Sequence, residues 1–302
     1  MKAVQIRAYG APEQLEVTDV PTPAPGLGEV LVRVRAVSIN PVDYKWRAGG
    51  PLDSFPLILG WDVSGVVEAV GPYVMEFRPG DEVFGMLNFP QPGRAYAEYV
   101  TARVADIALK PAGLSHEDAA AMSLAALTAH QGLEKMKLRA GQGILIHAGA
   151  GGVGHYAVQL ARARGAHVTA TASAANEAFV RALGADRIVD YRAQPFETQV
   201  RDMDAVLDTV GGDTLSRSFE VVRPGGWVVS IAAPIPPEAR GVRAARILVY
   251  PSRAHLEALA DLVRSGQLRS HVSQVFPLAR VADAHRAQAT GRTVGKIVLT
   301  VS

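Results

Sequence analysis

The stretch Ile144-Leu-Ile-His-Ala-Gly-Ala-Gly-Gly-Val-Gly154 joins a short apolar run to glycines with the spacing G-x-G-x-x-G, and a helix-compatible segment, 155–164, follows it. In such a turn the first glycine permits the tight bend, the second lets the backbone approach a pyrophosphate, and the third lets the helix pack close to the strand. The free N–H groups and the positive dipole end of the helix favour phosphate there. The stretch therefore predicts a dinucleotide-binding turn. Its expected cofactor-binding residues are Gly149, Gly151, Gly152, Val153 and Gly154.

The strand expected at 167–171 decides which dinucleotide binds. An NAD site usually places an Asp or Glu near the end of this strand to bond the ribose 2′-OH. Here Ala172-Ser-Ala-Ala-Asn176 follows, with no acid before Glu177. A carboxylate would repel a 2′-phosphate, whereas a hydroxyl and an amide can donate hydrogen bonds to it, so the segment favours NADP(H). The expected contacts are Ser173 and Asn176, with Tyr191 and Arg192 after the next strand as further partners. An ordinary polar loop, with Arg192 as a solvated surface charge, is the alternative.

Composition narrows the class of protein. The 302 residues include 31 basic and 29 acidic residues and are 48% hydrophobic, which is typical of a folded globular chain of two domains. No Lys/Arg tract is present, so nucleic acid is not an expected partner. The start of the chain lacks a long apolar segment, and no 18-residue apolar run occurs, so a cytoplasmic protein is expected. The absence of cysteine excludes disulfides, thiolate nucleophiles and Cys-ligated metals.

The pattern of elements changes along the chain. Up to about residue 113, short alternating runs such as 29–37 are separated by Pro/Gly turns, which indicates a barrel-like β domain. Ser115 followed by Asp118 predicts a helix start, and from there strands and helices alternate as in a doubly wound parallel sheet. The segments 270–276 and 295–301 are expected to be strands that return to the first domain, with no helix-rich repeat between them.

Several blocks of the chain, in this order, resemble the medium-chain dehydrogenase/reductase superfamily, and within it the zinc-independent quinone oxidoreductase group that includes zeta-crystallin. They are Ser38-Ile-Asn-Pro-Val-Asp-Tyr-Lys45, Pro56-Leu-Ile-Leu-Gly-Trp-Asp-Val-Ser-Gly-Val-Val67, Gly80-Asp-Glu-Val-Phe-Gly85, Leu127-Thr-Ala-His130, the glycine turn, Leu183-Gly-Ala-Asp186 and Asp208-Thr-Val-Gly-Gly212. The resemblance implies an α/β fold: a Rossmann doubly wound parallel sheet plus a GroES-like β-rich barrel domain. The implied boundaries are 1–113, completed by 267–302, for the GroES-like domain and 114–266 for the Rossmann domain.

The resemblance also bears on metals. Zinc-dependent relatives bind the catalytic metal through a Cys and a His, at positions that correspond here to Asn40 and Trp61. The Cys-rich lobe for a structural zinc is also missing. No metal is therefore expected, and alcohol oxidation is disfavoured because no Lewis acid would polarise an alkoxide.

The implied reaction is hydride transfer from NADPH to a quinone or an α,β-unsaturated carbonyl, without zinc. Charge develops on the carbonyl oxygen, which needs a hydrogen-bond donor and a proton source. The loop after the first long strand is expected to face the nicotinamide. The expected catalytic residues are Asn40, Tyr44 and Trp61. Asn40 could instead stabilise the turn before Pro41, Tyr44 could line the cleft, and Trp61 could be a core residue.

Further cofactor contacts follow from the same resemblance and from strand ends. Thr128 corresponds to a family position near the nicotinamide, with a bond back to its own helix as the alternative. Val210 and Ile231 lie at the ends of later sheet strands, where open α/β sheets bind ligands. His147 and His155 are expected to be packing or surface residues.

Two rival functions remain open. One is an enoyl-thioester reductase, and the other is an NADPH-binding sensor or structural protein without turnover. Arg246-Ile-Leu-Val-Tyr250 resembles the sheet-edge strand through which family members dimerise, and an exposed apolar edge usually needs covering, so a homodimer is expected.

Overall fold

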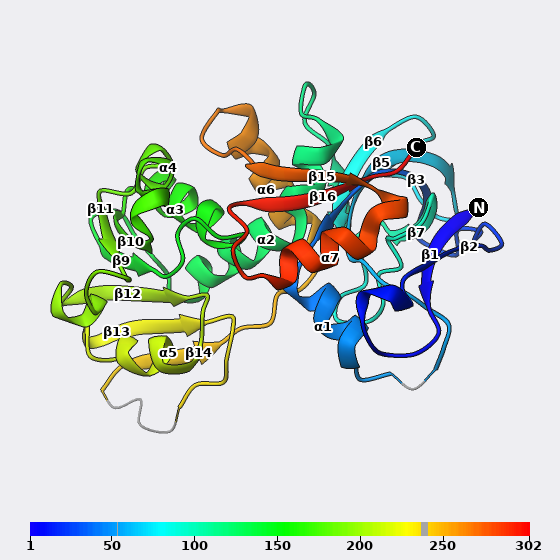
Figure 1. Cartoon of the computed structure of the whole chain (residues 1–302). Coiled ribbons are helices and arrows are strands. Elements are labelled where there is room, and N and C mark those ends of the chain that lie inside the picture. Colours follow the sequence, from blue (N-terminus) through cyan, green and yellow to red (C-terminus); the bar gives the residue numbers. More distant parts are fainter. Residues whose placement is uncertain (53, 237–240) are drawn as a thin grey trace. The chain divides into compact units, whose positions relative to one another are not determined.

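The computed structural model describes residues 1–52, 54–236 and 241–302, and Figure 1 shows its elements along the chain. The chain divides into two compact units. The first unit is Met1–Leu127 with Tyr250–Ser302, and the second unit is Thr128–Val249. The expected boundaries at 113/114 and 266/267 therefore differ from the limits of the compact units.

Packing explains this difference. Helix α2 (His116–Lys135) begins in the first unit, where Ala120 and Ala121 pack in one buried cluster with Ala36 and Val298. At the other boundary, helix α6 (Arg253–Arg264) starts with a backbone hydrogen bond from Arg253 N–H to the carbonyl of residue 105, at 2.9 Å. Helical periodicity assigns both segments to the α/β part of the chain, but their contacts, apolar for α2 and a backbone hydrogen bond for α6, join them to the first unit.

Two sheets form the first unit. A three-stranded sheet has the order β2-β1-β4 and contains β1 (Lys2–Ile6), β2 (Glu16–Asp19) and β4 (Leu57–Ile58). A seven-stranded sheet has the order β15-β16-β3-β5-β6-β8, with β7 also paired to β3. Its strands are β3 (Glu29–Ile39), β5 (Asp62–Val70), β6 (Glu82–Met86), β7 (Tyr99–Arg103), β8 (Ile107–Leu109), β15 (Val272–Pro277) and β16 (Lys296–Thr300). Short 3₁₀ turns lie at η1 (Pro12–Gln14) and η4 (Leu278–Arg280).

Strand β3 organises this larger sheet. Its alternating apolar residues enter a buried core that includes Val30, Val32 and Val34, as the period-two pattern predicts. Its first half pairs with β7 and its second half with the C-terminal strand β16, both antiparallel. The pairing of β16 with β3 confirms the expected return of the chain's end to the first domain. It also places Lys296, the first residue of β16, beside the end of β3.

Three elements differ from the sequence-based expectations. The segment after β3 is helix α1 (Pro41–Gly49) and not a loop, because Asn40 caps it and Pro41 stands at its first position. A helix, α7 (Val281–Ala289), lies between β15 and β16, where no helix-rich segment was expected. The edge strand expected at 246–250 is shifted: β14 is Arg243–Arg246, and the apolar residues after it lie outside the strand.

The second unit is built on a six-stranded parallel sheet with the order β11-β10-β9-β12-β13-β14. Numbered from β9, this is the strand order 3-2-1-4-5-6 of a Rossmann sheet, which confirms the expected doubly wound fold. The strands are β9 (Gly143–Ile146), β10 (His167–Ala172), β11 (Arg187–Asp190), β12 (Met203–Asp208), β13 (Val222–Ser230) and β14. The connecting elements are α3 (Gly154–Ala163), η2 (Ala174–Asn176), α4 (Glu177–Ala182), η3 (Phe196–Thr198) and α5 (Gly212–Ser218).

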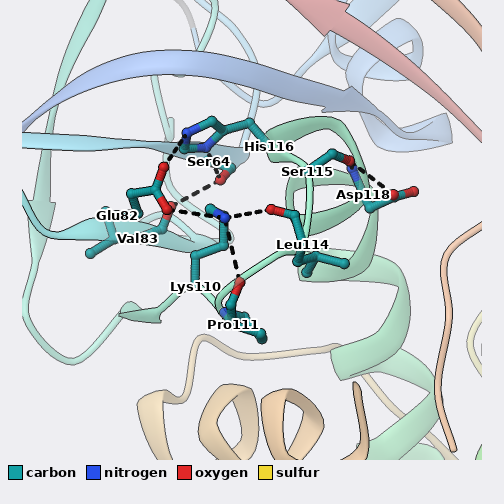
Figure 2. A network of polar contacts seen from close by, with 9 residues as sticks. All are labelled: Ser64, Glu82, Val83, Lys110, Pro111, Leu114, Ser115, His116 and Asp118. Atoms are coloured by element: carbon teal, nitrogen blue, oxygen red, sulfur yellow. Dashed lines mark hydrogen bonds and ion pairs between the residues drawn. The ribbon is translucent and has the colours of Figure 1, made fainter. Parts of the chain in front are cut away.

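A polar network fixes the start of α2 to the strands of the first unit (Figure 2). Ser115 caps the helix as expected, since its Oγ accepts from the Asp118 N–H at 3.0 Å. His116 Nε2 lies 3.2 Å from a Glu82 carboxylate oxygen, and Nδ1 lies 2.8 Å from the Ser64 hydroxyl. The Lys110 ammonium lies 3.2 Å from the other Glu82 oxygen. The helix start is thus tied to β5, β6 and the segment after β8.

Candidate active site

The glycine turn between β9 and α3 has the geometry of a phosphate cradle. Gly149 N–H donates to the Thr171 carbonyl at 2.8 Å, and a Cβ on Gly154 would lie 2.1 Å from the Ala148 oxygen. Only glycine therefore allows this close approach of α3 to the turn. Within the described residues, the backbone N–H groups of Gly152 and Val153 have no acceptor in the chain. Unpaired amides at a helix start fit a pyrophosphate.

The polar residues expected at the 2′-phosphate follow two adjacent strands. Ala172 at the end of β10 pairs in register with Asp190 at the end of β11, so Ser173 and Tyr191 start from neighbouring points of one sheet edge. Ser173 is buried and Asn176 is half-buried. The Arg192 guanidinium stacks on the exposed Tyr191 ring, 5.7 Å from its centroid, which holds a positive charge near this edge.

Val210 and Ile231 lie beyond the ends of β12 and β13. The Asp208 carboxylate is fully buried and accepts from the Val210 N–H at 3.0 Å and from the Ser230 hydroxyl at 2.7 Å. The backbone oxygen of Asp208 accepts from the Ile231 N–H at 3.0 Å. Asp208 thereby fixes both backbone segments at the edge where the glycine turn also lies.

Three further residues of the second unit are buried. Thr128 is 5% exposed on α2. His147 is 1% exposed, and its Nε2 lies 3.0 Å from the Ser218 hydroxyl; burial lowers its pKa to about 4, so it is neutral at pH 7. His155 Nδ1 lies 2.9 Å from the Gly151 carbonyl oxygen. These contacts make the two histidines part of the packing around the turn, in line with the expectation for them.

In the first unit, Asn40 stands at the centre of a buried polar cluster. Its backbone N–H donates to Asp43 Oδ2 at 2.6 Å, which completes the cap of α1. Its side-chain Nδ2 donates to Asp62 Oδ2 at 2.8 Å. Its side-chain Oδ1 accepts from Lys296 Nζ at 2.5 Å. The turn-stabilising role and a second role for the side-chain amide therefore coexist, because the cap engages the backbone N–H of Asn40 while its Nδ2 group bonds Asp62.

The charges in this cluster are shielded from solvent. Burial raises the pKa of Asp62 to about 6, although Lys296 and the Asn40 amide oppose the shift. Burial also raises the pKa of Asp43 to about 7, with repulsion from Asp62 adding to it. The pKa of Lys296 is lowered by burial and sustained by Asp62 and Asp43. Two carboxyl groups and one ammonium thus share one desolvated site.

A second chain of groups ends on Asp43. The Arg47 Nε–H can only donate, so His285 Nδ1 accepts from it at 3.3 Å and the imidazole proton is on Nε2. That proton is donated to the Tyr96 oxygen at 3.0 Å, which leaves the Tyr96 hydroxyl proton for the neighbouring Asp43 carboxyl. Burial lowers the pKa of His285 to about 3, which agrees with a neutral ring.

Tyr44, Lys45 and Trp61 have different surroundings. Tyr44 is half-buried on α1, and no hydrogen bond of its hydroxyl occurs among the described residues, while Lys45 is exposed. Trp61 is fully buried. Its indole N–H donates to the Gln91 carbonyl at 2.7 Å, and its ring packs edge-on against Trp46 and Phe89. The contacts of Trp61 are those of a core residue.

Lys296, Tyr96 and His285 are not among the residues predicted from the sequence, and Asp62 has no predicted role. The sequence around Lys296 indicates that this residue could have been singled out, because a charged residue stands at the start of the apolar run Ile297–Leu299. A lysine next to such a run is rarely fully buried unless it is paired. Nothing in the local sequence names Asn40 as its partner.

Comparison with known proteins agrees with this architecture. The family model for the "alcohol dehydrogenase GroES-like domain" matches residues 26–112, and that for "zinc-binding dehydrogenase" matches residues 183–299. A quinone oxidoreductase of Pseudomonas aeruginosa is 35% identical over 99% of both chains. An NADPH-dependent alkenal/one oxidoreductase of Arabidopsis thaliana chloroplasts is 35% identical over 99% of this chain and 79% of its own length.

A solved structure is similar over the whole chain. The quinone oxidoreductase from Coxiella burnetii is 37% identical and superimposes with a TM-score of 0.95, covering 100% of this chain and 99% of its own. Its similarity extends over both the sheet that carries the glycine turn and the sheet that carries the Asn40 cluster. The chain therefore belongs to the medium-chain dehydrogenase/reductase superfamily of oxidoreductases, in the group that contains the quinone oxidoreductases.

Proposed function

We propose that the protein is an NADPH-dependent reductase of quinones and α,β-unsaturated carbonyl compounds. The observation that carries the proposal is the glycine turn. Its Gly152 and Val153 amides have no acceptor in the described part of the chain, and with the close approach at Gly154 they fit a dinucleotide pyrophosphate. The names of the relatives, a quinone oxidoreductase and an alkenal/one oxidoreductase, support the substrate class.

The reduced nicotinamide supplies the hydride when it is bound, and the protein supplies orientation and electrostatic stabilisation. Negative charge develops on the substrate carbonyl oxygen and needs a donor. Asn40 Nδ2 carries two protons, of which one is donated to Asp62. We assign the second Nδ2 proton to the substrate oxygen, with the Tyr44 hydroxyl as the other donor. Trp61 is assigned a supporting role, because its polar atom is already engaged by the chain.

The preference for NADPH rests on the end of β10. Ser173 and Asn176 offer donors where an acidic residue would bind a free ribose 2′-OH. The stacked Tyr191 and Arg192 add a positive charge at the same sheet edge. Thr128, Val210 and Ile231 complete the proposed cofactor contacts.

A metal at the Asn40 position is not part of the proposal. The Asn40 amide oxygen, which would be the ligand atom, accepts from the Lys296 ammonium at 2.5 Å. A second cation at this oxygen would face that ammonium in a desolvated site, where like charges repel strongly.

The test is NADPH consumption with 1,4-benzoquinone, 9,10-phenanthrenequinone, an alkyl enone and crotonyl-CoA, each repeated with NADH. We expect turnover of a quinone or the alkyl enone with NADPH preferred. Turnover confined to crotonyl-CoA would support an enoyl-thioester reductase instead. NADPH binding without any turnover would support the sensor, and equal rates with NADH would contradict the assigned 2′-phosphate contacts.

The proposal extends to the assembly and the location of the protein. No helix in the described part of the chain is long and apolar enough to cross a membrane. We propose a homodimer through the sheet edge at β14, beside which the Leu248 side chain is 58% exposed. Sedimentation at micromolar concentration tests it, and a monomer would contradict it. A cytoplasmic location without nucleic acid partners is part of the same proposal, and cell fractionation tests the location.

A further inference from the structure

Asn40 holds its side-chain amide between two buried, oppositely charged groups. The oxygen Oδ1 lies 2.5 Å from Lys296 Nζ, and the nitrogen Nδ2 lies 2.8 Å from Asp62 Oδ2. Asn40, Asp62 and Lys296 are 2%, 0% and 3% exposed, so solvent does not screen either charge. The dipole of the amide is therefore aligned along the line from the cation to the anion.

The two charges are themselves fixed to the backbone. Lys296 Nζ also donates to the Ile39 carbonyl at 3.0 Å, at the end of β3. The other Asp62 oxygen, Oδ1, accepts from the Leu124 N–H of α2 at 2.7 Å. Neither charge can therefore follow the amide if the amide rotates.

We infer that Lys296 and Asp62 are positioning residues that lock the Asn40 amide in one orientation. Rotation of the amide by half a turn would place Nδ2 against the ammonium and Oδ1 against the carboxylate, so that two attractive contacts become two repulsive ones. In the locked orientation the second Nδ2 proton is the one donor of the amide that no group among the described residues accepts. A donor fixed before the reaction needs no reorganisation when charge develops on a substrate oxygen.

The inference rests on the proposed function, because it assumes that the second Nδ2 proton serves the substrate. It adds that Lys296 and Asp62 affect turnover only through Asn40. A double-mutant cycle separates such coupling from independent effects. The variants are Lys296→Met, Asn40→Ala and the two combined, assayed for kcat and KM with the best substrate of the panel and for NADPH binding by fluorescence.

We expect Lys296→Met to lower kcat by about 10- to 100-fold, with NADPH affinity unchanged, because a misaligned donor costs less than the roughly 100- to 1000-fold loss on removing a donor outright. In the Asn40→Ala background the same substitution should change kcat less than about twofold, because the group on which it acts is gone. Equal losses in both backgrounds would overturn the inference and leave the proposed function intact. If Asn40→Ala leaves kcat unchanged, the donor role fails and the lock fails with it.

Lys110→Met is the matched control. The Lys110 side chain is 4% exposed and its ammonium also joins a carboxylate and main-chain carbonyls, as Figure 2 shows, but none of these partners is Asn40. We expect it to reduce thermal stability without lowering kcat. If Lys110→Met lowered kcat as much as Lys296→Met, the loss would be a general effect of removing a buried lysine, and the inference would be overturned. Should Lys296→Met fail to fold, Lys296→Met combined with Asp62→Asn removes both charges at nearly constant shape and takes its place.

A second readout does not need turnover. The chain contains three asparagines, Asn40, Asn88 and Asn176, so selective ¹⁵N labelling gives three side-chain amide pairs in an NMR spectrum. We expect the Asn40 pair to be sharp and protected from solvent exchange, and to broaden or lose protection in Lys296→Met, while the more exposed Asn88 and Asn176 pairs stay unchanged. An Asn40 pair that keeps its protection and line width in the variant overturns the lock whether or not the protein turns over.

Discussion

Lys296 Nζ donates to Asn40 Oδ1 at 2.5 Å, a contact between residues 256 positions apart in the chain. It joins the first residue of the C-terminal strand β16 to the cap of helix α1. The side-chain nitrogen of the same asparagine donates to Asp62. The residue assigned to the substrate oxygen therefore also links the buried charges of Lys296 and Asp62.

Gly154 and Gly151 have different tasks in the glycine turn: Gly154 allows the close packing of helix α3, and Gly151 allows the approach of the pyrophosphate. A Cβ at 154 would lie 2.1 Å from the Ala148 oxygen, whereas one at 151 would lie 3.2 Å from it. We expect Gly154→Ala to lower the free energy of unfolding by about 1–3 kcal/mol, as overpacking does, and to abolish NADPH binding. Gly151→Ala should weaken NADPH binding with a much smaller change in stability. Urea unfolding and NADPH fluorescence titration measure both, and equal stability losses would contradict this division.

Ser173 and Asn176 determine the cofactor preference in our proposal. Removing one hydrogen bond to a charged phosphate costs about 1.5–3 kcal/mol, so Ser173→Ala should raise the Kd of NADPH roughly 10- to 100-fold. The Kd of NADH should stay within about twofold, because NADH has no 2′-phosphate, and this makes NADH the internal control. Titration of both cofactors against Ser173→Ala and Asn176→Ala provides the measurement. A parallel loss for both cofactors would show that these side chains only shape the loop.

Tyr44 and Tyr96 form a matched pair of hydroxyl groups. The Tyr44 hydroxyl has no hydrogen bond among the described residues, whereas Tyr96 accepts from His285 Nε2 at 3.0 Å. We expect Tyr44→Phe to reduce kcat by about tenfold at unchanged melting temperature. Tyr96→Phe should lower the free energy of unfolding by about 1–3 kcal/mol, since it leaves a buried donor unpaired. Thermal unfolding and steady-state kinetics on both variants test these expectations. An unchanged kcat in Tyr44→Phe would show that the Tyr44 hydroxyl takes no part in the reaction.

Asp43 makes stability depend on pH. Its pKa in the folded protein is about 7, above the ordinary value of 3.8, mainly through burial. The folded state therefore holds this proton more tightly than the unfolded chain does. The resulting contribution to stability is complete below about pH 4 and is lost as the pH rises to about 7.

Asp43→Asn keeps an acceptor for the Asn40 N–H but cannot ionise. We expect the stability of the wild type relative to this variant to fall by a few kcal/mol between about pH 4 and pH 8. Urea unfolding of both proteins across this range measures the difference, which includes the change that loss of the Asp43 charge makes in the titration of the neighbouring Asp62. A difference that does not vary with pH would show that Asp43 is not protonated in the folded state near neutrality.

Several features that depend on residues close together in the sequence were predicted correctly, whereas the contacts between distant residues around Asn40 were not. The glycine turn between a strand and a helix, the alternation behind the parallel sheet and the Ser115 cap depend on residues a few positions apart, and all three occur as expected. Helix α1 was missed because its start, Asn40-Pro41, is typical of a turn as well as of a helix cap. The capping contact between Asn40 and Asp43 decides that this segment forms a helix.

The sequence by itself determined the fold class and the position of the glycine turn between a strand and a helix, because glycine spacing and hydrophobic period are local properties. Only the tertiary structure decided the surroundings of Asn40. Strand β16 pairs with β3 and brings Lys296 to the amide oxygen, and β5 brings Asp62 to the amide nitrogen. Charges far apart in the chain acquire a partner only through the packing of strands, and burial then strengthens their interaction because water no longer screens it.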